Sequence, residues 1–163
     1  MPHTVDPRHL VSTLTGAWRV GASNIPEWLG GQRRAATVSF EPVAGHPLRL
    51  THSVSYTLPD GHRERRSSVA VWHRDRFVSR GKRLQMLFPS RWRVTGASED
   101  EAICVIRFVG TRAMPAGITV LVRVGHALPD LRGVVGREHE GFGLSPEEFA
   151  RLRWFDLSSV ALR

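Results

Sequence analysis

Few residues in this sequence have both a reactive side chain and a spacing from other such residues that could support catalysis or metal binding. His52 replaces an apolar residue on an alternating stretch, where it is either a buried histidine bonded to a neighbour or a ligand contact. Cys104 lies within the apolar run 102–106, which favours a small buried hydrophobic side chain over a nucleophile. No serine lies in a Gly-x-Ser-x-Gly elbow, and His139-Glu140 lacks the second histidine of a helical zinc motif. No metal site is predicted, and catalytic residues are unknown.

A set of large side chains could instead line a pocket for a small molecule. Most of them fall on predicted strands whose alternation would turn one face inward, and one lies in the first long loop. The predicted ligand-binding residues are Trp28, His52, Tyr56, Trp72, Met86, Phe88, Trp92 and Phe108. Because aromatic residues on barrel strands more often belong to the core than to a ligand site, the prediction rests on the set and not on any single member.

These residues are positioned by short strands in which apolar residues recur at every second position. The clearest strand is 48–57, and the turn Pro59-Asp60-Gly61 joins it to residues 65–72 in a predicted hairpin. Further strands are predicted at 18–20, 37–40, 76–79, 84–88, 90–95, 102–109 and 118–124. A strand about every ten residues is typical of an all-β barrel or sandwich.

Helical signals occur only near the two ends of the sequence. One short helix is predicted after the Asp6-Pro7 cap, and another follows Ser145-Pro146 and ends before Trp154. A looser helix is predicted around residues 128–137. Neither a linker rich in proline and glycine nor an internal repeat divides the chain, so residues 1–163 are predicted to form one domain.

The composition limits the partners and the compartment. The net charge of +8 comes almost entirely from scattered arginines, which predicts a solvated basic surface and disfavours nucleic acid as a partner. A polyanion site at the clusters 33–34, 63–66 and 80–83 is the alternative. The single cysteine excludes an intramolecular disulfide. No stretch has the length and hydrophobicity of a signal peptide or a membrane span, so a cytoplasmic location is expected.

The short helix, the Gly16-x-Trp18 triplet on the first strand, the meander of hairpins and the C-terminal helix together resemble the lipocalins and their calycin relatives. Intracellular bacterial lipocalin-like proteins are the closer comparison, with nitrobindins and fatty-acid-binding proteins as relatives. The resemblance implies an all-β, antiparallel up-and-down calycin-type barrel of about 8–10 strands with short N- and C-terminal helices. It also implies that a basic residue of a late strand packs across Trp18 at one barrel end. Arg123 is the first candidate and Arg107 the second; the alternative is that both point outward.

The function that this resemblance implies is a lipocalin-like protein that encloses a small, largely apolar ligand in its barrel. The first alternative is a barrel enzyme of the cyclase or isomerase type acting on a biosynthetic intermediate, with His52, Tyr56 and Arg123 as its polar groups. The second alternative is a nitrobindin-like haem protein; His126 and His139 are the available histidines, and neither matches the family's motif. Apart from haem no cofactor is predicted, and a homodimer is compatible with the sequence.

Overall fold

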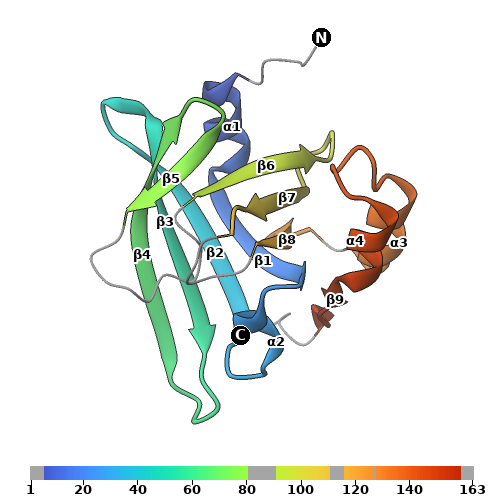
Figure 1. The fold of residues 1–163 in the computed structure, drawn as a ribbon. Coiled ribbons are helices and arrows are strands. Elements are labelled where there is room, and N and C mark those ends of the chain that lie inside the picture. The colour runs from blue at the N-terminus through green and yellow to red at the C-terminus, as the bar shows by residue number, and fades with distance from the viewer. Residues whose placement is uncertain (1–5, 81–90, 111–115, 127, 159–163) are drawn as a thin grey trace.

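The chain winds into a closed antiparallel β-barrel with helices at its two ends in the computed structural model (Figure 1). The structure describes residues 6–80, 91–110, 116–126 and 128–158. The elements in chain order are α1 (Pro7–Leu14), β1 (Gly16–Ser23), α2 (Pro26–Leu29), β2 (Arg34–Val43), β3 (His46–Thr57), β4 (Arg63–His73), β5 (Arg76–Arg80), β6 (Arg91–Ala97), β7 (Ile103–Phe108), β8 (Gly117–Arg123), α3 (Leu131–Arg137), α4 (Pro146–Arg151) and β9 (Arg153–Trp154).

Strand β1 closes the ring, because it pairs with both ends of the meander that runs from β2 to β8. Trp18 lies opposite Val38 of β2 on one side and opposite Arg123 of β8 on the other. Every pairing between consecutive strands is antiparallel, so eight strands within the described residues form an up-and-down barrel. The predicted all-β calycin-type barrel with short terminal helices is therefore confirmed.

The interior of the barrel is filled from the inward row of each strand. On β3 the residues Leu50, His52, Val54 and Tyr56 are all buried, as the alternation in the sequence predicts. Leu50, Val54 and Tyr56 pack in one cluster with inward residues of the other strands, including Trp18, Phe40, Phe77, Trp92, Cys104, Ile106 and Phe108. The barrel core is therefore rich in aromatic side chains.

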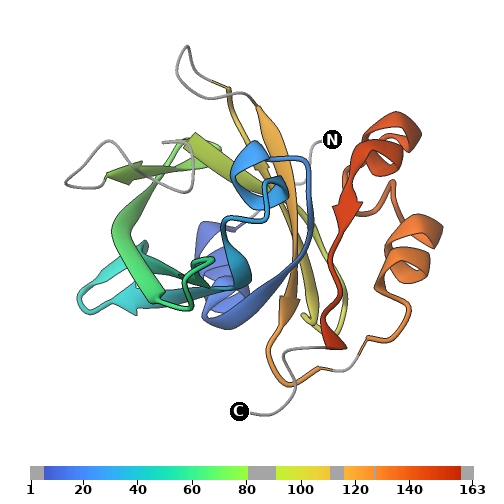
Figure 2. The ribbon, with the colours of Figure 1, turned by 90° about the horizontal axis from the view of Figure 1, so that it is seen from below.

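A second apolar cluster lies outside the barrel, where the C-terminal part of the chain covers the outer face of β1, β7 and β8 (Figure 2). Leu131 and Val135 of α3 and Phe142 pack on Val120 and Val122 of β8. Strands β7 and β8 are buried on both faces, so most of their residues are apolar without alternation.

Helix α4 is fixed to the barrel by an ion pair. Ser145 and Glu148 form a capping box at its N-terminus, and Arg107 of β7 donates to Oε1 of Glu148 over 2.6 Å. Arg107, the second candidate for the partner of Trp18, therefore points outward and bonds Glu148 instead.

Arg123 is the residue that packs across Trp18, at the barrel end next to α1, which we call the α1 end. Its guanidinium carbon lies 4.1 Å from the centre of the indole ring. The same guanidinium donates to the carbonyl oxygens of Thr13, Thr15 and Glu101 over 2.6–2.9 Å. Trp18 Nε1 donates to the carbonyl oxygen of Leu14 over 2.8 Å, so strand β8, strand β1 and helix α1 are locked together.

Several elements differ from the sequence-based expectation. The short helix α2 and the two-residue strand β9 were not predicted, because four and two residues are too few to show a period. The predicted strand at 84–88 lies outside the described residues. None of the helices in the described part of the chain is long and apolar enough to span a membrane.

Candidate functional site

The structure divides the predicted ligand-binding residues between the packed core and the barrel end next to α2, which we call the α2 end. Trp92 and Phe108 are buried in the core, at 2% and 1% exposure. Trp72 is partly buried against them. Trp28 and Tyr56 are also buried but lie at the α2 end. Met86 and Phe88 lie outside the described residues.

The core aromatics contact one another. The rings of Phe77 and Trp92 stack with their centres 4.6 Å apart, and Phe40 lies 5.7 Å from Trp92 on another side. Trp72 meets Phe77 edge to face at 5.0 Å. Such contacts stabilise a core beyond the burial of area alone, so this layer is part of the scaffold that supports the α2 end.

His52 is buried and bonded to neighbouring side chains. Its Nε2 contacts Ser68 Oγ and lies 3.0 Å from Ser79 Oγ, which also accepts a hydrogen bond from Trp92 Nε1 over 2.8 Å. Burial lowers the pKa of His52 to about 4, so the imidazole is neutral at neutral pH. Of the two readings of His52 from the sequence, these bonds match the buried histidine held by neighbours.

Tyr56 carries a polar network at the α2 end. Its hydroxyl donates to Glu64 Oε2 over 2.8 Å and accepts from Arg66 Nε over 3.2 Å. The guanidinium carbon of Arg33 lies 5.0 Å from the centre of the Tyr56 ring. The bond from Tyr56, together with the charge of Arg66, lowers the pKa of Glu64. Two arginines and one carboxylate therefore surround the outer end of this inward tyrosine.

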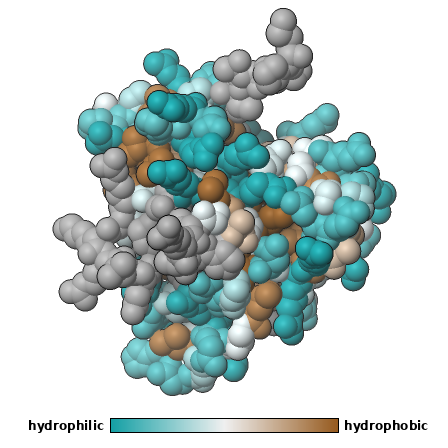
Figure 3. All heavy atoms as spheres, in the orientation of Figure 1, coloured by the Kyte–Doolittle hydropathy of each residue, from teal (hydrophilic) through white to brown (hydrophobic). Residues whose placement is uncertain are grey.

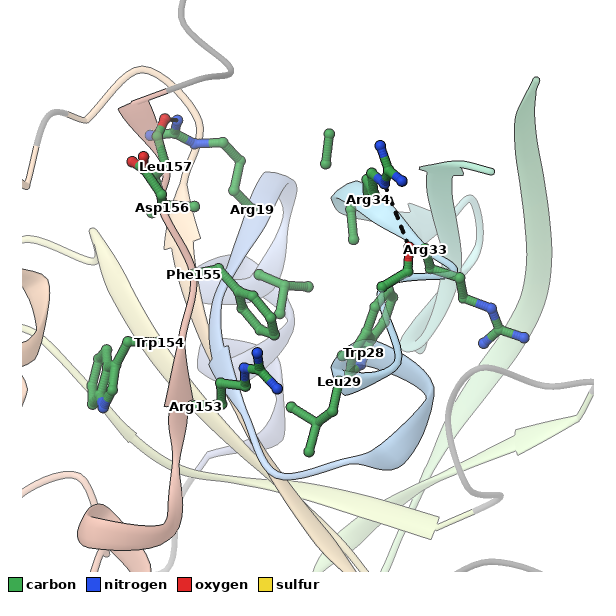
Figure 4. Close-up of a pocket in the computed structure, with 14 residues that line it drawn as sticks. Arg19, Trp28, Leu29, Arg33, Arg34, Arg153, Trp154, Phe155, Asp156 and Leu157 are labelled. Atoms are coloured by element: carbon green, nitrogen blue, oxygen red, sulfur yellow. Dashed lines mark hydrogen bonds between the residues drawn. The ribbon is translucent and has the colours of Figure 1, made fainter. Parts of the chain in front are cut away.

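A pocket of about 470 Å³ lies beside this network, between β1, α2, the start of β2 and residues 153–157 (Figure 4). Trp28 and Phe155 face the hollow from opposite sides. Val20 and Trp28 belong to the barrel core, and Ala36 and Phe155 pack against it. The inner wall of the pocket is therefore continuous with the apolar interior of the barrel.

The pocket exists because β1 and β2 separate. They pair from Gly16 to Arg19, and β1 then bulges between Val20 and Ala22. Beyond the bulge β9 takes the edge of β1 that β2 has left, while β8 stays paired along the other edge. The segment after β9 follows β1 in the space that β2 has left. It is held there by a bond from the amide of Phe155 to the carbonyl oxygen of Gly21, 2.9 Å long.

Arginines form much of the pocket rim. Arg19, Arg33, Arg34 and Arg153 line it, together with one acidic residue, Asp156. Arg153 extends its guanidinium toward the space between Phe155 and Leu29 (Figure 4). Sequence reasoning did not find Arg153 and Phe155, because they meet Trp28 only through the fold. The pair Arg33-Arg34 is visible in the sequence, where it indicates a solvated surface or, as the alternative, a polyanion site.

The outer surface offers little apolar area for a ligand. On the face shown in Figure 3, hydrophobic residues form small groups among hydrophilic ones. Among the described residues, the exposed large hydrophobic side chains are Val69 and Val124. A larger hollow of about 1140 Å³ lies on the outer face of β3 to β6. The described residues that line it are arginines, valines, His73 and Asp75, and no tryptophan, tyrosine or phenylalanine is among them. A third hollow, of about 480 Å³, lies outside the barrel and is lined in part by Leu128, Leu131, Trp154 and Leu157. The pocket at the α2 end is the candidate site for an apolar molecule because its inner wall continues into the barrel core.

The remaining candidates lie apart from this pocket. His126 is exposed in the turn after β8, and His139 lies near α3 with Nδ1 3.1 Å from the carbonyl oxygen of Gly136. Neither histidine lines the barrel, so their positions do not fit an axial ligand for haem inside it. Arg123 lies at the α1 end, away from Tyr56, and the three polar groups named for an enzyme do not converge. No group of three or more metal-binding side chains occurs in the described segments.

Cys104 is an interior residue of β7. Its side chain is buried, and burial raises the pKa of the thiol to about 12. A thiol that stays protonated is a poor nucleophile. The expectation of a small buried hydrophobic side chain agrees with this environment.

Comparison with solved structures places the barrel among known folds. No family model and no curated protein sequence matches the chain. Insecticyanin from the tobacco hornworm Manduca sexta is 15% identical with a TM-score of 0.66 over 93% of this chain and 82% of that one. The siderocalin Ex-FABP is 11% identical with a TM-score of 0.60, and the match covers 91% of this chain and 97% of that one. Japanin from Rhipicephalus appendiculatus, in complex with cholesterol, is 8% identical with a TM-score of 0.53 over 77% and 85%. The closed eight-strand ring, the Trp18–Arg123 contact at the α1 end and these neighbours show that the chain has the lipocalin-like, calycin-type barrel fold.

Proposed function

We propose that this protein binds a small, largely apolar molecule at the α2 end of its barrel. The observation that carries the proposal is the pocket of about 470 Å³ whose inner wall, formed by Val20, Trp28 and Phe155, continues into the barrel core. Small-molecule sites are concave, largely apolar and typically about 300–1,000 Å³ in volume. The structural neighbours include a protein in complex with cholesterol, which supports the same class of ligand.

A fluorescent probe tests this proposal directly. Phenylnaphthylamine is neutral and apolar, and its emission rises when it leaves water. We expect saturable binding by the purified protein with one probe per chain. No binding of this probe, together with no uptake from a library of apolar molecules in native mass spectrometry, would contradict the proposal.

A substitution that fills the pocket locates the site. Ala36 lines the pocket and is half-buried, so Ala36→Phe places a ring in the space that the probe would occupy. We expect this variant to lose probe binding at least tenfold. Ala97→Phe, at an exposed strand end on the far side of the barrel, is the matched control and should bind as the parent does. Equal binding by both variants would place the probe elsewhere.

A further inference from the structure

The pocket at the α2 end combines an apolar wall with an excess of positive charge. Among the described residues, four arginines line it against the single carboxylate of Asp156. That carboxylate already accepts hydrogen bonds from the amide and hydroxyl of Ser158. A low-dielectric wall strengthens the attraction between these arginines and an anion inside the pocket. The charge therefore favours a ligand that is apolar but not neutral.

Two of the four arginines are already occupied by the protein. Arg19 donates to the carbonyl oxygens of Leu157 and His126 over 3.0 and 3.4 Å, and Arg33 lies over the ring of Tyr56. The other two are available. Arg34 makes a bond of 3.5 Å to the carbonyl oxygen of Gly31, and Arg153 makes no side-chain hydrogen bond or ion pair with the described residues. Both side chains are exposed at the pocket rim.

The pocket lining also contains buried donors without acceptors. Trp28 Nε1, Arg19 Nε and Arg33 Nη1 are shielded from solvent and have no hydrogen-bond partner among the described residues. An unsatisfied buried donor costs roughly 1–3 kcal/mol. A ligand oxygen could bond these atoms only after a side-chain movement that exposes them to the pocket, so the positive charge of the rim carries the inference.

We infer that this pocket takes an amphipathic anion, whose apolar body lies between Trp28 and Phe155 and whose carboxylate or sulfonate lies beside Arg153, with Arg34 adding positive charge on the opposite side of the rim. The inference rests on the proposed function, since it assigns the chemical class of the molecule bound at that same site. The guanidinium of Arg153 suits a carboxylate or a sulfonate, because its forked donors can bond two oxygens of either group.

Two probes that differ by one charged group test the inference. Anilinonaphthalene sulfonate is phenylnaphthylamine with a sulfonate added. We expect the sulfonate to bind at least tenfold more tightly than the neutral probe at low salt, and the advantage to shrink as salt is raised. The double substitution Arg34→Ala and Arg153→Ala should remove most of this advantage and change the affinity for the neutral probe by less than about twofold.

A matched control separates local contacts from net charge. Arg93 and Arg151 are exposed and do not line the pocket, and their double replacement by alanine lowers the net charge by the same amount. This control should keep the preference for the sulfonate. If the neutral probe binds but the sulfonate binds no tighter, or if the control loses the preference as fully as the pocket variant, the inference is wrong and the proposed function stands. If neither probe binds and native mass spectrometry finds no uptake from the apolar library, the proposed function itself fails.

Discussion

Arg123 lies over Trp18 with its guanidinium carbon 4.1 Å from the centre of the indole ring, and the two residues are also paired across β8 and β1. One side chain thus joins the last barrel strand to the first through a ring contact and to the preceding helix through carbonyl bonds. This arrangement makes the α1 end a structural closure, in contrast to the pocket at the α2 end.

Replacing Arg123 by leucine should strongly destabilise the barrel. The change removes the ring contact and leaves three carbonyl oxygens without their donor, which should cost roughly 2–4 kcal/mol of unfolding free energy. Urea denaturation followed by tryptophan fluorescence measures this. The control is Arg93→Leu on the exposed face of β6, for which we expect little change. Equal effects of the two substitutions would argue against a closure role.

Gly16 should tolerate no side chain. Its φ is +121°, and a Cβ there would lie 2.8 Å from Nη1 of Arg123. Gly16→Ala should therefore cost about 2–3 kcal/mol from backbone strain and the displaced guanidinium. Gly45 also has a positive φ, +75°, but open space around the added carbon, so Gly45→Ala should cost only about 1 kcal/mol. Thermal or urea unfolding compares the pair, and a smaller loss at Gly16 would contradict the prediction.

His52 should make the barrel sensitive to mild acid. Its pKa falls from 6.5 to about 4 on folding, so the unfolded chain binds the proton more tightly than the folded one. Stability is therefore retained at neutral pH and lost as the pH falls from 6.5 toward 4, by up to about 1.4 kcal/mol per pH unit from this residue.

The variant His52→Gln isolates this effect. It should be less stable at neutral pH, because the bonds to Ser79 and Ser68 are altered, but its stability should fall less steeply between pH 6.5 and 4. Urea denaturation at several pH values gives both quantities. Parallel pH profiles for parent and variant would show that His52 does not titrate on unfolding.

The ion pair between Arg107 and Glu148 should hold α4 on the barrel. Arg107 and the Ser145 amide lower the pKa of Glu148 from 4.5 to about 2, so its stabilising contribution is present above pH 4.5 and lost toward pH 2. Both side chains are about one-third exposed, so Glu148→Gln should cost only about 1 kcal/mol. Glu147→Gln, in the same turn of the helix, is the control. Hydrogen exchange of α4 amides should increase in the first variant and not in the second.

The sequence predicts the barrel well where one face of a strand is buried and the other is solvated. The row from Leu50 to Tyr56 has this pattern, and the structure places it inward. Strand β4 does not have it, because its first half is polar on both faces. Arg66 and Glu64 point toward Tyr56 there, although the basic hairpin reads as a solvated surface. Alternation of apolar and polar residues cannot reveal an inward ion pair.

The candidate site was predictable only in part. Trp28 in the first long loop is among the predicted ligand-binding residues and lines the pocket, whereas Tyr56 on β3 lies beside the pocket under Arg33. Phe155 and Arg153 were not found, because they reach the pocket by following β1 after the bulge at Gly21. No local pattern encodes that contact. It depends on where two strands separate in the folded barrel.

The contact of residues 153–157 with β1 should also form late in folding. Arg19 and Leu157 are 138 positions apart in the chain, so this contact closes the longest loop in the fold among the side-chain bonds described. Closing such a loop costs more entropy than forming the neighbouring hairpins. During refolding we therefore expect the hairpins to form before residues 153–157 dock along β1. Recovery of probe binding should then lag behind recovery of the tryptophan fluorescence of the folded barrel.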